Sequence, residues 1–204
     1  MSLHSYFFES IEVLEAALQS WSEELLAEAI ETITRALQSG KPMLVCGNGG
    51  SAADAMHLTS ELVGRFLLER QALNVICLAS NAAVLTSCAN DNGFETVFSR
   101  QVEAYGTPGG VLVGISTSGN SKNVVAAFEQ ARALDMKTIA LTGEGGGRLS
   151  LLSDYLFAVP SRSTPLIQQV HLCLYHYLCQ TIERELAVPM EQVSGASDQR
   201  PKLY

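Results

Sequence analysis

Four hydroxyl side chains cluster in the segment 116–121, which reads STSGNS. The segment follows an apolar run and precedes a helical pattern, so we expect it at a helix N-terminus. Hydroxyl groups, unpaired backbone N–H groups and the helix dipole would together bind a phosphate there. The sequence has neither a Walker loop nor a GxGxxG fingerprint, and an ordinary N-cap turn would explain the segment equally well.

A second glycine-rich segment, residues 47–51, also joins an apolar run to a helical pattern. Its glycines would let the backbone approach a ligand closely. His57 and Glu61 follow on that helix, and their i, i+4 spacing places them on one face, where they could converge on a metal ion or a substrate. A surface pair of His and Glu is the alternative.

A third set of polar side chains, Gln168, His171 and His176, lies inside an apolar helical run near the C-terminus. Buried imidazoles need a hydrogen bond or a metal. Gln168 and His176 are eight residues apart, roughly 12 Å along a straight helix, so one regular helix cannot present both to one ion. Either the helix is distorted after Pro165 or two subunits share the site.

Asn90 and Asp91 form a further polar pair between the apolar run 82–89 and Asn92-Gly93. Turn chemistry accounts for such a sequence, so we interpret the pair as a turn. The residues alone therefore assign it no ligand role.

Helices and strands alternate along the chain in a way that would position these groups. Residues 6–38 have helical spacing with a break near residues 20–22, which predicts two helices. Short apolar runs that lead into helical patterns predict strands at residues 42–46, 74–78, 111–115, 137–141 and 155–159. A long helix is expected over residues 164–186. Five parallel strands with helices on both faces follow, and such sheets bind ligands at the carboxyl ends of their strands.

Composition limits the function further. The 204 residues carry a net charge of −8, which argues against nucleic acid and anionic membranes as partners. Five cysteines without a CxxC pair, and an N-terminus unlike a signal peptide, fit a reducing cytoplasm. We expect N-terminal helices over residues 1–40 that pack on the core or the oligomer, one α/β domain over residues 41–187, and a disordered tail over residues 188–204.

Six segments occur in order along the chain: CGNGGSAADAMH, ELVGRF, ANDNGFETVFSRQVEA, GISTSGNSKNVVAA, KTIALTGEGGG and IQQVHLCLYH. Together they resemble the sugar isomerase (SIS) domain family, and within it the sedoheptulose-7-phosphate isomerases. The resemblance implies a three-layer αβα sandwich around a five-stranded parallel sheet, with residues 41–187 as the SIS domain. It also implies a homotetramer with active sites at subunit interfaces, and one Zn²⁺ per subunit.

The implied reaction is the aldose–ketose isomerisation of sedoheptulose 7-phosphate to D-glycero-D-manno-heptose 7-phosphate, a step toward the heptose of bacterial surface polysaccharide. An enediol route needs a base beside the carbonyl carbon and an acid for the carbonyl oxygen, and the resemblance assigns these roles to Glu61 and His176. It assigns the zinc ligands to His57, Glu61, Gln168 and His176. It assigns the substrate contacts to Asn48, Gly49, Gly50, Ser51, Glu61, Asn90, Asp91, Ser116, Thr117, Ser118, Ser121 and Gln168.

Two alternatives differ in function. Some SIS tetramers are non-catalytic, as adaptors for a replication initiator or as phosphosugar-binding regulators, and these have no need for the four proposed zinc ligands. An isomerase for another sugar phosphate would differ in pocket length. Leu166 and Gln169 stand where many relatives have Arg and Glu, so we expect such a difference there.

Overall fold

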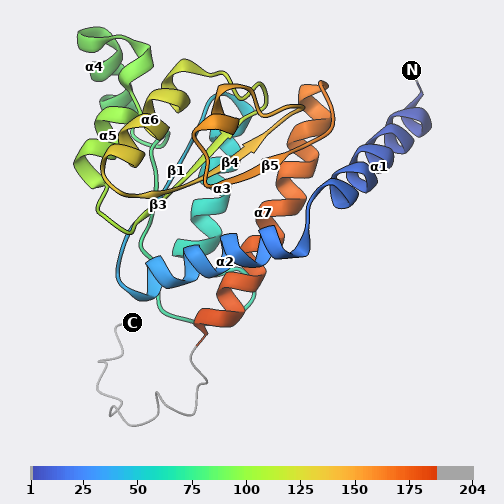
Figure 1. The fold of residues 1–204 in the computed structure, drawn as a ribbon, viewed down its shortest axis with the longest axis horizontal. Coiled ribbons are helices and arrows are strands. Elements are labelled where there is room, and N and C mark those ends of the chain that lie inside the picture. The colour runs from blue at the N-terminus through green and yellow to red at the C-terminus, as the bar shows by residue number, and fades with distance from the viewer. Residues whose placement is uncertain (1, 188–204) are drawn as a thin grey trace, which may run out of the picture.

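The sheet is the centre of the structure, a computed structural model that describes residues 2–187. Five parallel strands lie in the order β2-β1-β3-β4-β5 (Figure 1). Their bounds are β1 Met43–Gly47, β2 Val75–Cys77, β3 Val111–Ser116, β4 Lys137–Thr142 and β5 Tyr155–Ala158. All five strands predicted from apolar runs are therefore confirmed, with ends that differ by at most one residue.

Seven α-helices and two 3-10 helices surround or flank this sheet in the described residues. They are α1 Leu3–Ser20, α2 Glu23–Gln38, α3 Gly50–Val63, α4 Ala82–Asn92, η1 Phe94–Thr96, α5 Ser99–Tyr105, α6 Lys122–Ala133, η2 Gly147–Leu151 and α7 Thr164–Leu186. The predicted break between the first two helices falls at Trp21 and Ser22, where the Ser22 hydroxyl accepts the Leu25 N–H and begins α2.

Both faces of the sheet are covered, which confirms the three-layer α/β prediction. Along β1 and β3, Val45 and Val113 pack towards α2, α3 and α7, whereas Leu44 and Leu112 pack towards α5 and α6. Burial on both faces explains why the strands are continuous apolar runs. Close packing also requires Gly114 in β3, because a Cβ there would lie 2.2 Å from the Phe128 ring of α6.

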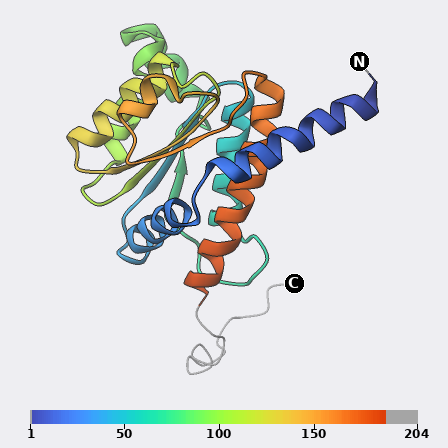
Figure 2. The same cartoon turned by 45° about the vertical axis from the view of Figure 1, so that its right-hand side comes forward.

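The N-terminal half of α1 stands away from this core. Figures 1 and 2 show α1 extending beyond the sheet. Its C-terminal half packs on α7 through Ala17 and its neighbours, and in its N-terminal half the Tyr6 hydroxyl accepts a hydrogen bond from Gln169 Nε2 of α7 at 3.0 Å. Phe7 and Phe8 are 60% and 54% exposed on the projecting half. These exposed rings form an apolar patch on the projecting half of α1.

Helix replaces the irregular structure expected at two places. The turn predicted at Asn90-Asp91 is wrong, because both residues lie in the last turn of α4, which Asn81 caps and Gly93 ends. The proposed distortion near Pro165 is also absent, since α7 runs without interruption from Thr164 and contains Gln168. The tail expected at residues 188–204 lies outside the described residues, which contain no helix long and apolar enough to cross a membrane.

Candidate active site

The packing of α3 against α7 brings three of the predicted site residues together. His57 Nε2 lies 3.0 Å from Glu61 Oε1, as their spacing on α3 predicts. The ring of His176, on α7, lies with its centroid 5.0 Å from that of His57. We call His57, Glu61 and His176 the helix group. It places a carboxylate beside two imidazoles, which is a donor set suited to proton transfer.

Two residues that the sequence did not single out hold this group in place. The hydroxyl of the fully buried Tyr175 lies 3.0 Å from His57 Nδ1 and donates to Asp54 Oδ1 at 3.5 Å. Burial raises the pKa of Asp54, against the lowering effects of Tyr175 and His57. In the sequence, Tyr175 lies inside the apolar helical run over residues 164–186. Its hydroxyl fixes the orientation of the His57 ring.

The electrostatic environment of His176 combines three effects. Partial burial lowers its pKa and the neighbouring His57 lowers it further, while Glu61 raises it. The net direction is downward, so the protonated imidazole is a stronger acid than a free histidine. Phe66 adds an aromatic contact, with its ring centroid 5.6 Å from that of His176.

The predicted phosphate segment forms a compact loop between β3 and α6. Ser116 Oγ lies 2.9 Å from Ser121 Oγ and 3.5 Å from Ser118 Oγ. Ser121 is the N-cap residue of α6, yet its hydroxyl caps none of the helix N–H groups. The Val124 N–H donates to Asn123 Oδ1, but no side chain of the described residues caps the N–H groups of Lys122 and Asn123 at the start of α6, so these groups could bind an anion together with the serine hydroxyls.

A reciprocal amide pair joins this loop to the glycine-rich loop. Asn48 Nδ2 donates to Asn123 Oδ1 and Asn123 Nδ2 donates to Asn48 Oδ1, both at 2.8 Å. Asn123 is buried in the first turn of α6, and its partner is a predicted substrate contact. The sequence signal for Asn123 is weak, because it is a single amide two residues after the STSGNS segment. In the structure it fixes the two ligand loops relative to each other.

Gln168 lies with these loops and apart from the helix group. Its Nε2 donates to Ser51 Oγ at 3.5 Å, and a Cβ on Gly50 would lie 2.5 Å from the same nitrogen. We call residues 48–51, residues 116–121 and Gln168 the loop group. Ser51 and Glu61 are ten residues apart on α3, about 15 Å along the helix axis. One subunit therefore separates the predicted site residues into two groups.

This separation bears on the predicted metal. Within residues 2–187, no three His, Cys, Asp or Glu side chains are arranged so that they could hold an ion. His57 and Glu61 are hydrogen-bonded to each other, and Gln168 is two helical turns from His176. The four predicted ligands of one subunit thus do not fit a metal ion by themselves.

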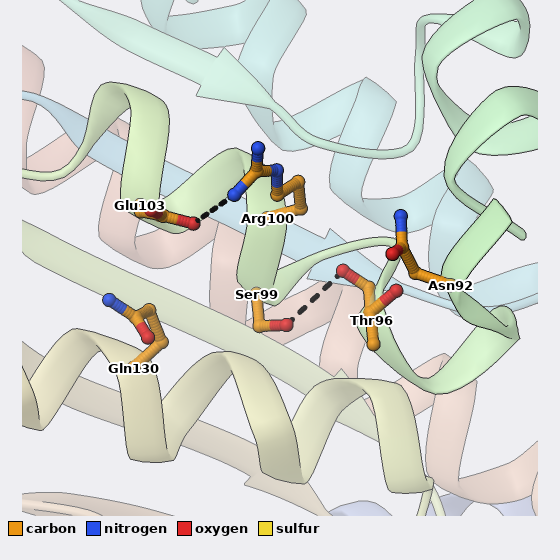
Figure 3. Close-up of a pocket in the computed structure, with 6 residues that line it drawn as sticks. All are labelled: Asn92, Thr96, Ser99, Arg100, Glu103 and Gln130. Atoms are coloured by element: carbon orange, nitrogen blue, oxygen red, sulfur yellow. Dashed lines mark hydrogen bonds and ion pairs between the residues drawn. The ribbon is translucent and has the colours of Figure 1, made fainter.

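Other predicted or suspected groups lie elsewhere. Asn90 Nδ2 donates to Asp91 Oδ1 at 2.8 Å, and both side chains are exposed. Beyond them a surface pocket of about 340 Å³ lies beside α5 and α6 (Figure 3), lined by Asn92, Thr96, Ser99, Arg100, Glu103 and Gln130. None of the predicted site residues lines it. The pocket is therefore separate from the proposed chemistry.

His171 has a structural role. It is completely buried, and its Nε2 lies 3.1 Å from the Thr142 carbonyl oxygen. Burial lowers the pKa of His171 to about 4, although the carbonyl contact raises it, so the ring is neutral near pH 7. Its Nδ1 is buried without a hydrogen-bond partner among the described residues, and His171 takes no part in the helix group.

Comparison with known proteins agrees with this geometry. The model of the SIS domain family matches residues 5–143. The chain belongs to the SIS domain family. A phosphoheptose isomerase of Helicobacter pylori is 48% identical over 89% of this chain and 94% of that protein. Such identity over almost the full length places the chain beside the enzymes of the SIS family.

Two solved SIS structures are also similar. The phosphoheptose isomerase of Neisseria gonorrhoeae gives a TM-score of 0.83 at 40% identity, covering 89% of this chain and 97% of that one. A phosphoheptose isomerase from Francisella tularensis gives a TM-score of 0.85 at 37% identity, covering 89% and 96%. The fold is thus that of these SIS proteins.

The Asn48–Asn123 pair generates a stability prediction. Replacing Asn123→Ala leaves the Asn48 amide without its buried partner, which is expected to lower the free energy of unfolding by about 1–3 kcal/mol. Urea unfolding at a fixed protein concentration measures the change. Asn90→Ala, an exposed amide, is the control and should change it by less than about 0.5 kcal/mol. Equal losses in the two variants would contradict the assigned role of the pair.

Proposed function

We propose that the chain is an isomerase that converts sedoheptulose 7-phosphate to D-glycero-D-manno-heptose 7-phosphate through an enediol. The observation that carries the proposal is the helix group, in which α3 and α7 hold a carboxylate next to imidazoles. The phosphoheptose isomerases at 37–48% identity support the same substrate. Five free cysteines favour the cytoplasm as the place of the reaction.

Glu61 and His176 divide the proton transfers between them. Glu61 would remove the proton on the carbon next to the carbonyl, and His176 would protonate the carbonyl oxygen, which gives the enediol. Glu61 would then return its proton to the neighbouring carbon while His176 takes the proton of the hydroxyl that becomes the new carbonyl oxygen, which completes the isomerisation and restores both side chains. Both transfers use side chains of this chain.

The loop group would bind the phosphate of the substrate. The hydroxyls of Ser116, Ser118 and Ser121 and the free N–H groups of α6 suit a dianion without a basic residue. Such a local cradle also explains how a protein with a net charge of −8 binds an anion. Binding energy at the remote phosphate would hold the reacting carbons beside the helix group, so loss of this cradle would lower kcat/KM.

We further propose a homotetramer in which two subunits build each active site. Ser51 and Glu61 are about 15 Å apart along α3, and Gln168 and His176 are about 12 Å apart along α7, so one subunit does not bring its two groups to one point. A second subunit that supplies one of the two groups would remove this difficulty. The exposed Phe7 and Phe8 of α1 offer an apolar surface for the assembly.

An adaptor or sensor is the alternative from the same family. Such a protein needs the phosphate loop alone, whereas this chain also holds Glu61 against His57 and both beside His176. Buried support from Tyr175 for the His57 ring would serve no purpose in a binding protein. The helix group therefore favours the enzyme.

Zinc is part of the proposal, with His57, Glu61, Gln168 and His176 as its ligands across two subunits. One subunit does not bring these four donors together, so we assign the ion no step in the reaction. Imidazole and carboxylate groups are nevertheless ordinary zinc ligands.

Removing either proton-transfer group should abolish most of the activity. Glu61→Gln and His176→Gln are each expected to lower kcat by about 100-fold or more, because acid–base catalysis contributes that much. Turnover of sedoheptulose 7-phosphate by the purified variants measures the effect. Glu129→Gln, an exposed carboxylate on α6, is the control and should keep wild-type turnover. Wild-type rates in both site variants would reject the assignment.

Breaking the α1 surface should separate the subunits. The double change Phe7→Asp with Phe8→Asp is expected to give folded subunits of lower mass, because charged residues cannot be buried between helices. Light scattering gives the mass, and turnover should fall with it. Leu151→Asp, at an exposed leucine of η2, is the control. A folded monomer with full activity would disprove the shared site.

Metal removal tests the zinc proposal. Dialysis against a chelator is expected to lower turnover, and adding Zn²⁺ back should restore it, because the proposed ligands need the ion to complete the site. Elemental analysis of each sample should give one zinc per subunit before treatment and after restoration. Full turnover by protein shown to be zinc-free would contradict the proposal.

A further inference from the structure

Glu183 is a buried carboxylate that the proposed reaction does not use. It lies on α7, seven residues after His176, and is 1% exposed. Its Oε1 accepts the N–H of Phe66 at 2.8 Å, and its Oε2 accepts the N–H groups of Leu67 and Leu68 at 2.6 and 2.9 Å. One side chain of α7 thus binds three successive N–H groups of the segment that follows α3.

Arg70 connects Glu183 to the backbone of Glu61. Its Nε lies 3.3 Å from Glu183 Oε1, and both side chains are 1% exposed. Its Nη2 donates to the backbone carbonyl oxygen of Glu61 at 2.9 Å. Burial raises the pKa of Glu183, but the three N–H groups and Arg70 outweigh burial and lower it. The carboxylate is therefore ionised and firmly held near neutral pH.

The same segment reaches the catalytic imidazole. Phe66, whose N–H binds Glu183, packs its ring 5.6 Å from the ring of His176. Because Glu183 and His176 are two turns apart on α7, they lie on the same face of that helix. The contacts therefore form a closed circuit from Glu61 through Arg70 and Glu183 to α7, and from Phe66 back to His176.

We propose that Glu183 is a positioning residue that fixes the distance between Glu61 on α3 and His176 on α7. The inference rests on the proposed function and extends it to a residue that touches no substrate. Both catalytic groups stand on helices that could slide by a fraction of an ångström, and misplacement of about 1 Å can cost 100-fold in rate. Three N–H bonds and an ion pair at one carboxylate prevent such a shift.

The variant Glu183→Gln tests the proposal. Its amide nitrogen would face an N–H donor, so at least one of the three bonds is lost. We expect kcat to fall by about 10- to 100-fold with KM unchanged, since the phosphate binds to the distant loop group. If Glu183→Gln fails to fold, the variant Phe66→Leu replaces it as the test. Phe66→Leu keeps the Glu183 carboxylate and its bonds to backbone N–H groups, and it should lower kcat by a similar factor because it removes the ring that contacts His176.

Asp154→Asn provides a matched structural control. Asp154 also accepts a backbone N–H, that of Thr138 at 2.8 Å, and pairs with Lys137 at 3.3 Å, but it lies at the opposite end of the sheet from the ligand loops. Its loss should lower the thermal midpoint and leave kcat as in wild type. An equal fall of kcat in Asp154→Asn and Glu183→Gln would overturn the proposal, because general destabilisation would then explain both.

The imidazole resonances of histidine-labelled protein give a readout that does not require turnover. Moving Phe66 changes its ring current on His176, so Glu183→Gln should shift the His176 resonance, whereas Asp154→Asn should not. An unchanged resonance together with unchanged kcat would overturn the proposal. If the wild type does not convert sedoheptulose 7-phosphate, the proposed function fails, and the His176 resonance alone decides the positioning role.

Discussion

The packing of α3 against α7 on one face of the sheet is the constraint on which the rest of the site depends. Both helices belong to the same buried cluster, and the hydroxyl of Tyr175 reaches across it to His57. The packing of the two helices places His176 of α7 beside His57 and Glu61 of α3. Without it the chain would have a phosphate loop and a surface ion pair, and no arrangement for moving a proton.

Helix geometry then divides the site. The glycine-rich loop begins α3 and Glu61 lies near its end, so the ligand loops and the helix group lie at different heights along one helix. Gln168 and His176 repeat the same separation on α7. Neither helix is bent enough to close this gap. The separation makes assembly a requirement of the proposed chemistry, and the projecting α1 provides a surface for it.

Local patterns in the sequence were sufficient for the fold and for half of the site. The strands could be predicted because burial on both faces leaves continuous apolar runs, and His57 with Glu61 because their contact spans four residues. Tyr175 and Asn123 could not, since their partners are 118 and 75 residues away. The turn prediction at Asn90-Asp91 was wrong because Asn, Asp and Gly are common both in turns and at the end of a helix, and α4 ends at Gly93. Glu183 gave no signal, because its three partners are backbone groups.

Proton exchange with solvent during turnover tests the central claim most directly, namely that Glu61 moves a proton between neighbouring carbons of the substrate. In D₂O, the product should gain deuterium at the carbon that receives this proton, because a carboxylate base exchanges it with solvent. Mass spectrometry and NMR of the product locate the label. Complete retention of the substrate's own hydrogen during wild-type turnover, as in a direct hydride shift, would contradict the account.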